Sequence, residues 1–420
     1  MSDTPVEPRI VEALHYGITP ERISAHARQV VERLQDAGYT AHLVGGCIRD
    51  LILGHAPKDF DVVTEAHPEE IRLVFRNARL IGRRFRLAHV QFGREIIEVA
   101  TYRAAPAAEP GEGDNIFGSI DEDARRRDFT VNALYYDPVE GLIRDYVGGL
   151  ADLEARVLRV IGDPEERFRE DPVRMLRAVR FAVRLQFELA RHDDRLLARL
   201  GPLLHDISPA RLFEEVLKLF QAGNAVANCE ALCEHHLFGV LFPPSAAFAG
   251  HKYPQDSVLM RALASTDQRV AEGKPVTPAF LFAALLWDPV HEGASRFVAQ
   301  GVAPADAWQR AAEEILHAQL KTITVPKRFS VPMREIWLLQ SRFDRRGGRQ
   351  ALRFLESKRF RAAYDFLGLR AHASDADRAL FDWWTRFQEV DDSGRQAMVE
   401  ALSEQPEKRT RRRRRSRRAR

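Results

Sequence analysis

Two carboxylates separated by one residue are the clearest candidates for chemistry in this chain. Asp59, Phe60 and Asp61 open an apolar, strand-like stretch that continues through Val62 and Val63. Because side chains alternate along a strand, we expect Asp59 and Asp61 on one face, about 7 Å apart, and Phe60 on the other. Two carboxylates at that distance repel each other unless a cation lies between them. Mg²⁺ suits such a pair, because it prefers oxygen ligands and usually keeps positions open for water and phosphate.

A glycine pair, Gly45 and Gly46, is the second feature that could take part in chemistry. A short strand-like run precedes the pair, and apolar residues at helical spacing follow it over 48–52. A glycine turn between a strand and a helix presents free backbone N–H groups to an anion. The two features together therefore predict a nucleoside triphosphate, with its phosphates over the glycines and two magnesium ions on Asp59 and Asp61. Each feature alone is common in surface turns.

The amino-acid sequences of these two stretches resemble those of a known family. Residues 43–50 read LVGGCIRD and residues 59–61 read DFD. Together they are similar to the head domain of nucleotidyltransferases, in the branch that holds poly(A) polymerases and CCA-adding enzymes. The resemblance implies that the glycine pair, Arg49 and Asp50 bind the nucleotide and that the two aspartates hold the metal ions. Cys47 stands where a glycine is common in that family, and it is not among the expected ligands.

Asp128 is a further candidate, because it opens directly into core-like sequence. A carboxylate in such a place needs a partner or a function. The sequence of residues 126–134, RRDFTVNAL, is similar to a signature of the same family. We interpret Asp128 as a third acidic residue of the site or as a ribose contact, and Arg126 or Arg127 as a phosphate contact.

Glu98 is an alternative third carboxylate. It lies on the second of two alternating strands, expected at 87–92 and 95–101 and joined at Gly93. In an antiparallel sheet this strand could bring Glu98 next to the aspartate pair. A surface glutamate on an edge strand is an equally good interpretation.

A motif for reading the nucleobase is expected near Asp171 and Arg174. Asp171 is predicted to cap a helix whose first position is Pro172, so that acceptor and guanidinium lie at one end of the helix. An acceptor and a multi-donor group placed together could read the edge of a base without a template. Spacing alone favours a plain helix cap with a surface arginine. The family resemblance implies instead that the EDPVR motif at residues 170–174 contacts the incoming base.

Basic residues continue along the same predicted helix and reappear at the end of the chain. Arg177 is assigned to the nucleotide, and Arg180 and Arg184 to RNA phosphates. Residues 407–420 hold ten Lys and Arg and one Glu, a composition expected to be disordered alone and to bind a polyphosphate. The RNA contacts assigned to this tail are Arg411, Arg412, Arg413, Arg414 and Arg415.

The composition is that of a soluble globular protein. With 420 residues, 45% hydrophobic and 29% charged, the chain is long enough for two or more domains. Its longest apolar run, 279–287, is too short to span a bilayer. Three cysteines cannot form a disulfide framework, so we expect a cytoplasmic protein.

The order of strand-like and helical patterns predicts an α+β fold. Strands dominate the first part and helix follows helix from residue 192 onward, which indicates a nucleotidyltransferase head followed by an all-helical neck and body. The predicted divisions are a flexible segment 1–22, a catalytic head 23–155, a helical neck 156–240, an RNA-binding body 241–400 and a disordered tail 401–420.

A cluster of cysteines and histidines at 229–236 is not interpreted as a metal site. Structural zinc needs four converging ligands, usually from two loops, whereas Cys229 and Cys233 lie on one predicted helix. We expect both cysteines in the core.

The resemblance implies template-independent polyadenylation, the transfer of AMP from ATP to an RNA 3′-hydroxyl with release of pyrophosphate, which promotes RNA decay. The basic tail and the sequences of residues 83–90 and 359–365 resemble those of bacterial poly(A) polymerases, which favours that branch of the family. CCA addition to tRNA is the alternative, since it shares the head motifs. A non-catalytic RNA-binding protein on the same scaffold is the third interpretation.

The same resemblance specifies cofactors and partners. The cofactor is Mg²⁺, as two ions, with Mn²⁺ as a substitute, and ATP is the substrate. The partners are the 3′ ends of mRNA and small RNAs, bound with little sequence preference, together with RNA-decay or RNA-chaperone proteins.

Overall fold

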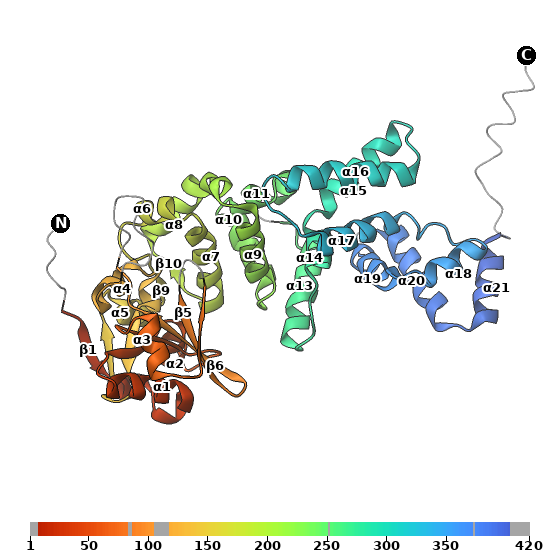
Figure 1. Cartoon of the computed structure of the whole chain (residues 1–420). Helices are drawn as coiled ribbons and strands as arrows, with labels where there is room; N and C mark the ends of the chain where they lie inside the picture. Colours follow the sequence, from red (N-terminus) through yellow and green to blue (C-terminus); the bar gives the residue numbers. More distant parts are fainter. Residues whose placement is uncertain (1–6, 83–85, 105–116, 251–252, 373, 404–420) are drawn as a thin grey trace, which may run out of the picture. The chain divides into compact units, whose positions relative to one another are not determined.

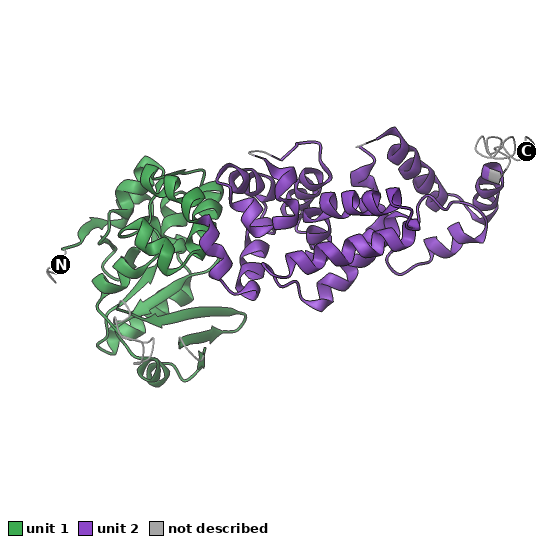
Figure 2. Cartoon of the chain, turned by 90° about the horizontal axis from the view of Figure 1, so that it is seen from above, with its two compact units in different colours: residues 1–200 green, residues 201–420 purple. Residues whose placement is uncertain are grey.

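A computed structural model describes residues 7–82, 86–104, 117–250, 253–372 and 374–403. The chain forms two compact units, residues 1–200 (unit 1) and residues 201–420 (unit 2) (Figure 2). All strands of the described residues lie in unit 1, and unit 2 is built from helices there (Figure 1). The predicted α+β head followed by helices is therefore confirmed. Arg411 to Arg415 lie outside the described part of the chain, as do residues 1–6 of the segment 1–22 that was predicted to be flexible. The rest of that segment forms a strand and two 3-10 turns.

Unit 1 is organised by an eight-stranded mixed sheet of order β1-β8-β7-β2-β3-β6-β5-β4. Neighbouring strands are antiparallel except β3 and β6, which are parallel. The strands are β1 (Arg9–Glu12), β2 (Ala41–Val44), β3 (Asp61–Thr64), β4 (Ala78–Ile81), β5 (Leu87–Phe92), β6 (Glu95–Thr101), β7 (Leu134–Asp137) and β8 (Leu142–Asp145). The two strands predicted at 87–92 and 95–101 are confirmed with their bounds. A separate parallel pair joins β9 (Val157–Leu158) and β10 (Glu188–Leu189).

The helices of unit 1 cover the sheet and extend beyond it. They are α1 (Ala25–Asp36), α2 (Gly46–Ile52), α3 (Pro68–Val74), α4 (Ile120–Arg126), α5 (Gly149–Ala155), α6 (Pro164–Glu170), α7 (Val173–Leu185) and α8 (Arg191–Leu200), with 3-10 turns η1 (Ala13–Tyr16), η2 (Pro20–Arg22) and η3 (Thr130–Asn132). Ala124 of α4 packs on Val44, Val63 and Tyr135, so α4 covers one face at the centre of the sheet. Leu43 points to the opposite face and is also fully buried.

Unit 2 contains helices that bury large aromatic side chains. They are α9 (Pro209–Phe220), α10 (Ala225–Glu234), α11 (Leu237–Leu241), α12 (Ala246–Ala249), α13 (Val258–Ala271), α14 (Pro278–Leu285), α15 (Trp287–Ala299), α16 (Pro304–Gln319), α17 (Lys327–Gln340), α18 (Arg349–Leu355), α19 (Phe360–Arg370), α20 (Asp375–Glu389) and α21 (Asp392–Ser403), with 3-10 turns η4 (Gly201–Asp206) and η5 (Pro243–Ser245). Trp337 is buried and its Nε1 donates to the Ala283 carbonyl at 2.9 Å. Cys229 and Cys233 are buried on α10, which confirms them as core residues.

No helix of the described segments is long and apolar enough to cross a membrane.

Candidate active site

The glycine turn joins β2 to α2 and is flanked by two guanidinium groups. Gly45 has φ 83°, a left-handed value that glycine adopts without strain. A Cβ atom on Gly45 would lie 3.7 Å from Arg127 Nη1, and one on Gly46 would lie 3.3 Å from Arg49 Nη2. The turn therefore combines the start of a helix with cationic side chains, which suits an anionic ligand.

Three carboxylates gather on the strands beside this turn. Asp61 is the first residue of β3, and its lateral neighbours in the sheet are Val44 of β2 and Glu98 of β6. Asp59 precedes the strand, so the strand predicted from Asp59 begins two residues later. Because residues that are partners across strands point to the same face, Glu98 and Asp61 lie side by side there. We call this side of the sheet the acidic face.

The electrostatics of Asp61 reflect this crowding. Partial desolvation raises the pKa of Asp61 to about 6, and the negative charges of Glu98 and Asp59 act in the same direction, while Arg127 opposes them. Asp61 still keeps solvent access. A bound cation would relieve the part of this shift that comes from the neighbouring negative charges.

The donor set fits magnesium. Carboxylate oxygens are the ligands that Mg²⁺ prefers, and it usually takes only one or two of them together with phosphate and water. Over the described ranges, no group of three or more His, Cys, Asp or Glu side chains is arranged to hold a metal by itself. Asp59 and Asp61 would leave positions on such an ion for phosphate oxygens and water.

Asp128 accepts hydrogen bonds from protein groups on both carboxylate oxygens. Its Oδ1 accepts from the Phe129 backbone N–H at 2.8 Å and from Asn132 Nδ2 at 3.1 Å. Its Oδ2 accepts from Arg177 Nε at 2.9 Å and from Arg177 Nη2. Burial alone would raise the pKa of Asp128, but the Arg177 guanidinium outweighs it and the pKa is lowered. The structure thus pairs Asp128 with Arg177 and places Glu98 beside Asp61, and the catalytic role of Asp128 stays a prediction.

A chain of hydrogen bonds and ion pairs links Asp128 to α2, the helix that follows the glycine turn. Asn132 Oδ1 accepts from Arg49 Nη1, and Arg49 Nε donates to Asp50 Oδ1 at 2.8 Å. Asp50 Oδ2 in turn accepts from Arg184 Nη2 at 3.3 Å. Arg49 is only 2% exposed. We call this set, with Asp128 and Arg177, the clamp network, because it ties α7 to α2 and η3 at two points.

Arg127 is held above the sheet by a second group of contacts. Its Nε donates to Asp123 Oδ2 and to the Tyr135 hydroxyl, both at 3.0 Å, and its Nη2 donates to Asp123 Oδ2 at 2.8 Å. Tyr135 and Asp123 raise the pKa of Arg127, although burial alone would lower it. The charge is therefore fixed next to Gly45. Arg126 contributes its backbone carbonyl, which accepts from Arg167 Nη2 at 2.6 Å.

The predicted base-reading pair lies at the start of α7. The helix begins at Val173 with Pro172 as N-cap, one residue later than predicted, and Asp171 Oδ1 accepts from the Val173 N–H at 3.3 Å. Arg174 Nη1 donates to Glu170 Oε2 at 2.6 Å and to the Arg167 carbonyl at 2.8 Å. Glu170 opens the predicted EDPVR motif but was given no role of its own there. Its position four residues before Arg174 is the signal for this ion pair.

The remaining predicted contacts also lie on α7, with one unpredicted neighbour on β5. Arg180 lies over the Phe181 ring at 4.6 Å, and the side chain of Arg184 is 48% exposed while it pairs with Asp50. On the acidic face, His89 of β5 is the lateral partner of Glu98, with its Nε2 3.4 Å from Glu98 Oε1. The alternation of the strand at 87–92 could have placed His89 there.

Comparison with known proteins links this geometry to one group of enzymes. Residues 41–159 match the Poly A polymerase head domain, residues 187–248 the Probable RNA and SrmB- binding site of polymerase A, and residues 300–419 the Polymerase A arginine-rich C-terminus. Poly(A) polymerase I of Escherichia coli O157:H7 is 46% identical over 428 residues, covering 98% of this chain and 92% of that protein. Its counterpart from Haemophilus influenzae is 43% identical and covers 93% of this chain and 90% of that protein.

CCA-adding enzymes are similar over a shorter part of the sequence. The Bacillus licheniformis enzyme is 38% identical over 224 residues, which is 52% of this chain and 55% of that protein. Among solved structures, the Bacillus stearothermophilus CCA-adding enzyme in complex with CTP superposes with a TM-score of 0.58 at 25% identity, over 89% of this chain and 84% of that chain. The nucleotidyltransferase fold predicted from the sequence is therefore confirmed.

Proposed function

The chain belongs to the poly(A) polymerase I family, and on that basis we propose that it adds AMP from ATP to RNA 3′ ends without a template. The observation that carries the proposal is the length of the similarity. Poly(A) polymerase I relatives match 98% and 93% of this chain, whereas the CCA-adding relative matches 52%. The C-terminal match at 300–419 is to the polymerase A family as well.

The reaction joins the RNA 3′-oxygen to the α-phosphorus of ATP. The bond from that phosphorus to the bridging oxygen breaks, and pyrophosphate leaves. In such a transfer the protein mainly positions the reactants and stabilises charge. Gly45 and Gly46 would receive the triphosphate, and Arg127, fixed by Asp123 and Tyr135, would face its negative charge.

Asp59 and Asp61 would hold two Mg²⁺ ions, for which Mn²⁺ could substitute, and Glu98 would be the third carboxylate. The ions held by these residues would supply Lewis-acid chemistry, which would lower the pKa of the 3′-hydroxyl and offset charge on pyrophosphate. The position of Asp61 beside Glu98 and Asp59 supports this assignment, because their negative charges add to the desolvation that raises the pKa of Asp61.

Helix α7 would present Asp171 and Arg174 to the incoming base. The clamp network supports this role, because Arg177 to Asp128 and Arg184 to Asp50 hold the helix at two points along its length. Asp128 and Arg177 would then act by positioning α7, and Arg49 and Asp50 by supporting the glycine turn. Arg180 and Arg184 would lie along the RNA backbone.

The cellular role follows from the same reaction. We propose that the RNA substrates are the 3′ ends of mRNA and small RNAs, that the added tracts promote RNA decay, and that RNA-decay or RNA-chaperone proteins are partners. We also propose that the protein acts in the cytoplasm.

The deciding experiment incubates the purified protein with Mg²⁺, a labelled RNA and each nucleoside triphosphate separately, and sizes the products. The proposal predicts long A tracts with ATP alone. Use of CTP with arrest after three additions on a tRNA would indicate CCA addition, and RNA binding without pyrophosphate release would indicate a non-catalytic protein.

A matched variant tests the assignment of the aspartates. Asp59→Ala should abolish nucleotide addition while RNA affinity persists. Loss of RNA binding in a folded Asp59→Ala protein would contradict the division between the acidic face and the helical body.

A further inference from the structure

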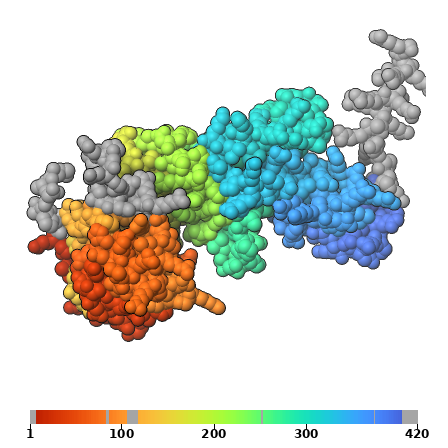
Figure 3. Space-filling view, viewed as in Figure 1, coloured from red at the N-terminus to blue at the C-terminus, as the bar shows by residue number. Residues whose placement is uncertain are grey.

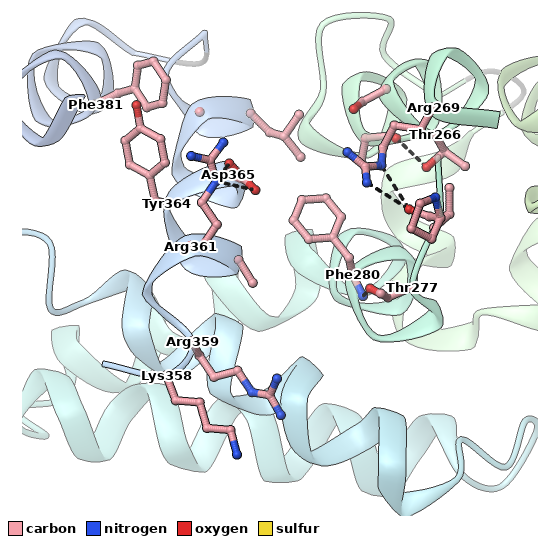
Figure 4. A pocket seen from close by; sticks show the side chains of 17 residues that line it. Thr266, Arg269, Thr277, Phe280, Lys358, Arg359, Arg361, Tyr364, Asp365 and Phe381 are labelled. Carbon is pink, nitrogen blue, oxygen red and sulfur yellow. Dashed lines mark hydrogen bonds and ion pairs between the residues drawn. The ribbon is translucent and has the colours of Figure 1, made fainter. Parts of the chain in front are cut away.

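A groove in unit 2 lies outside the site described above. Its volume is about 710 Å³, within the range of roughly 300–1,000 Å³ typical of ligand sites. One wall comes from α13 and the start of α14, and the other from α19 and α20 (Figure 4). Helices α13 and α19 are in contact, and in the space-filling view the green surface around α13 adjoins the blue surface of the later helices (Figure 3).

The walls carry an excess of positive charge. The lining side chains include the cations Arg269, Lys358, Arg359 and Arg361, against one carboxylate, Asp365. Anionic ligands would therefore be attracted to the groove.

The cations differ in how they are held. Arg269 Nε and Nη2 donate to the Pro275 carbonyl at 3.2 and 2.9 Å, which fixes the guanidinium on the α13 wall. On the opposite wall Arg361 pairs with Asp365 at 3.0 Å, but its side chain is 77% exposed, so the pair is loosely held and can be exchanged for another anion. Lys358 is exposed as well.

An aromatic ring stands between the two walls. Figure 4 shows Phe280 projecting from α14 into the space between Arg269 and Arg361. The ring is half-buried and is supported by Phe366, with centroids 5.6 Å apart in an edge-to-face arrangement. One side of the ring is thus held by the core while the rest remains accessible.

Two stacked aromatic side chains form part of the wall on α19 and α20. Tyr364 of α19 stacks on Phe381 of α20, with centroids 5.0 Å apart and ring planes at 16°. A side chain at Gly368 would come 2.9 Å from the Phe381 ring, so the close approach of these two helices depends on that glycine. The aromatic wall is therefore closely packed.

We propose that this groove binds a single-stranded segment of RNA, with phosphates at Arg269, Lys358 and Arg361 and a base stacked on Phe280. The proposal rests on the function proposed above, which requires a hold on RNA that is nearly independent of sequence. Cations along a groove supply that hold, and an aromatic ring stacks on any base because every base has a π-face. An acidic peptide would match the cations but would leave Phe280 without a specific role.

The test is the affinity of a 3′-deoxy RNA oligonucleotide, measured without ATP. The groove variant is Arg269→Glu with Lys358→Glu. The matched control is Arg310→Glu with Lys321→Glu, the same charge change at exposed positions of unit 2 that do not line the groove. The groove variant should bind about tenfold more weakly, and its slope of log affinity against log salt should fall by about 0.7 for each phosphate that is no longer bound. The control should change affinity less than about twofold.

A second variant separates stacking from charge. Phe280→Leu keeps an apolar side chain against Phe366 and removes the ring, so affinity should fall about fivefold while the salt slope stays unchanged. Circular dichroism checks that each variant is folded. Unchanged RNA affinity in both groove variants, or equal losses in the groove and control variants, would overturn the proposal and point to a protein ligand or to general charge attraction.

The outcome is separable from that of the polymerase assay. If the wild-type protein adds no nucleotide, the proposed function fails while the binding comparison still reports on the groove. If the groove variants add AMP and bind RNA as the wild type does, only the groove proposal fails. Cross-linking of RNA that carries 4-thiouridine, followed by peptide mapping, should place adducts on α14 and α19.

Discussion

The acidic face with its clamp network in unit 1 and the cationic groove in unit 2 use charge in opposite ways. In the clamp network each charged group is paired within the protein and the centre is buried: Arg49 is 2% exposed, and the side chain of Asp128 is 13% exposed. In the groove the cations are accessible, and Arg361 is 77% exposed.

The difference follows from the two tasks. Phosphoryl transfer gains from groups held at fixed positions before the reaction, because reorganisation then costs little. A hold on RNA of any sequence gains from accessible charge that meets the backbone wherever it lies. The predictions below test this contrast, beginning with the largest effect.

The largest effect is expected on catalysis. Asp61→Asn removes a proposed metal ligand from the acidic face, so AMP addition at saturating ATP and RNA should fall by at least about 10³-fold. RNA affinity, measured with the 3′-deoxy oligonucleotide, should stay within about twofold of the wild type. A parallel loss of RNA affinity would break the contrast between the two regions.

The next effect concerns the clamp network. Asp128→Ala leaves the Arg177 guanidinium without its carboxylate, and because Arg177 is partly exposed the loss should lie near 3 kcal/mol, the low end for a broken buried pair. Chemical denaturation measures it. Glu165→Ala, which removes an exposed partner of Arg169 and Arg199, is the control and should leave the midpoint unchanged. Equal midpoints for both variants would show that the clamp network is not a stabilising element.

A smaller effect links the acidic face to pH. The pKa of Asp61 is about 6 in the folded protein, against about 3.9 when unfolded, so its ionised form lowers stability above pH 6. Asp61→Asn lacks that cost, and without metal it should be more stable at pH 7–8 by about 1 kcal/mol, allowing for the solvent access of Asp61. The gain should fade as the pH falls from 6 to about 4. Thermal melts in EDTA measure it, and a destabilised variant at pH 8 would contradict the assignment.

The smallest effect is expected in the groove. Asp365→Asn removes the carboxylate that competes with RNA for Arg361, so RNA affinity at low salt should rise about twofold. Stability should change by less than about 0.5 kcal/mol, because the pair is exposed. Weaker RNA binding by Asp365→Asn would place the RNA outside the groove.

Local patterns predicted much of the fold. The alternation at 87–92 and 95–101 predicted both strand bounds, and the apolar spacing over 48–52 indicated helix α2. These features depend on neighbours within a few residues, and a single sequence contains that information. The start of β3 at Asp61 and of α7 at Val173 differed from prediction by one or two residues, as element ends often do.

Such local patterns could not predict contacts between segments that are distant in the sequence. Arg177 and Asp128 are 49 residues apart, and Arg184 and Asp50 are 134 apart, so no local spacing could pair them. The parallel pairing of β3 with β6, which places Glu98 beside Asp61, and the facing of α13 and α19 across the groove likewise depend on the topology.

The most direct test of the proposed active site is an experimental structure with a non-hydrolysable ATP analogue and Mg²⁺. We expect both ions on Asp59 and Asp61, with the triphosphate along Gly45 and Gly46 and near Arg127. A nucleotide seated in the groove of unit 2, or a triphosphate held away from the two aspartates, would contradict this assignment.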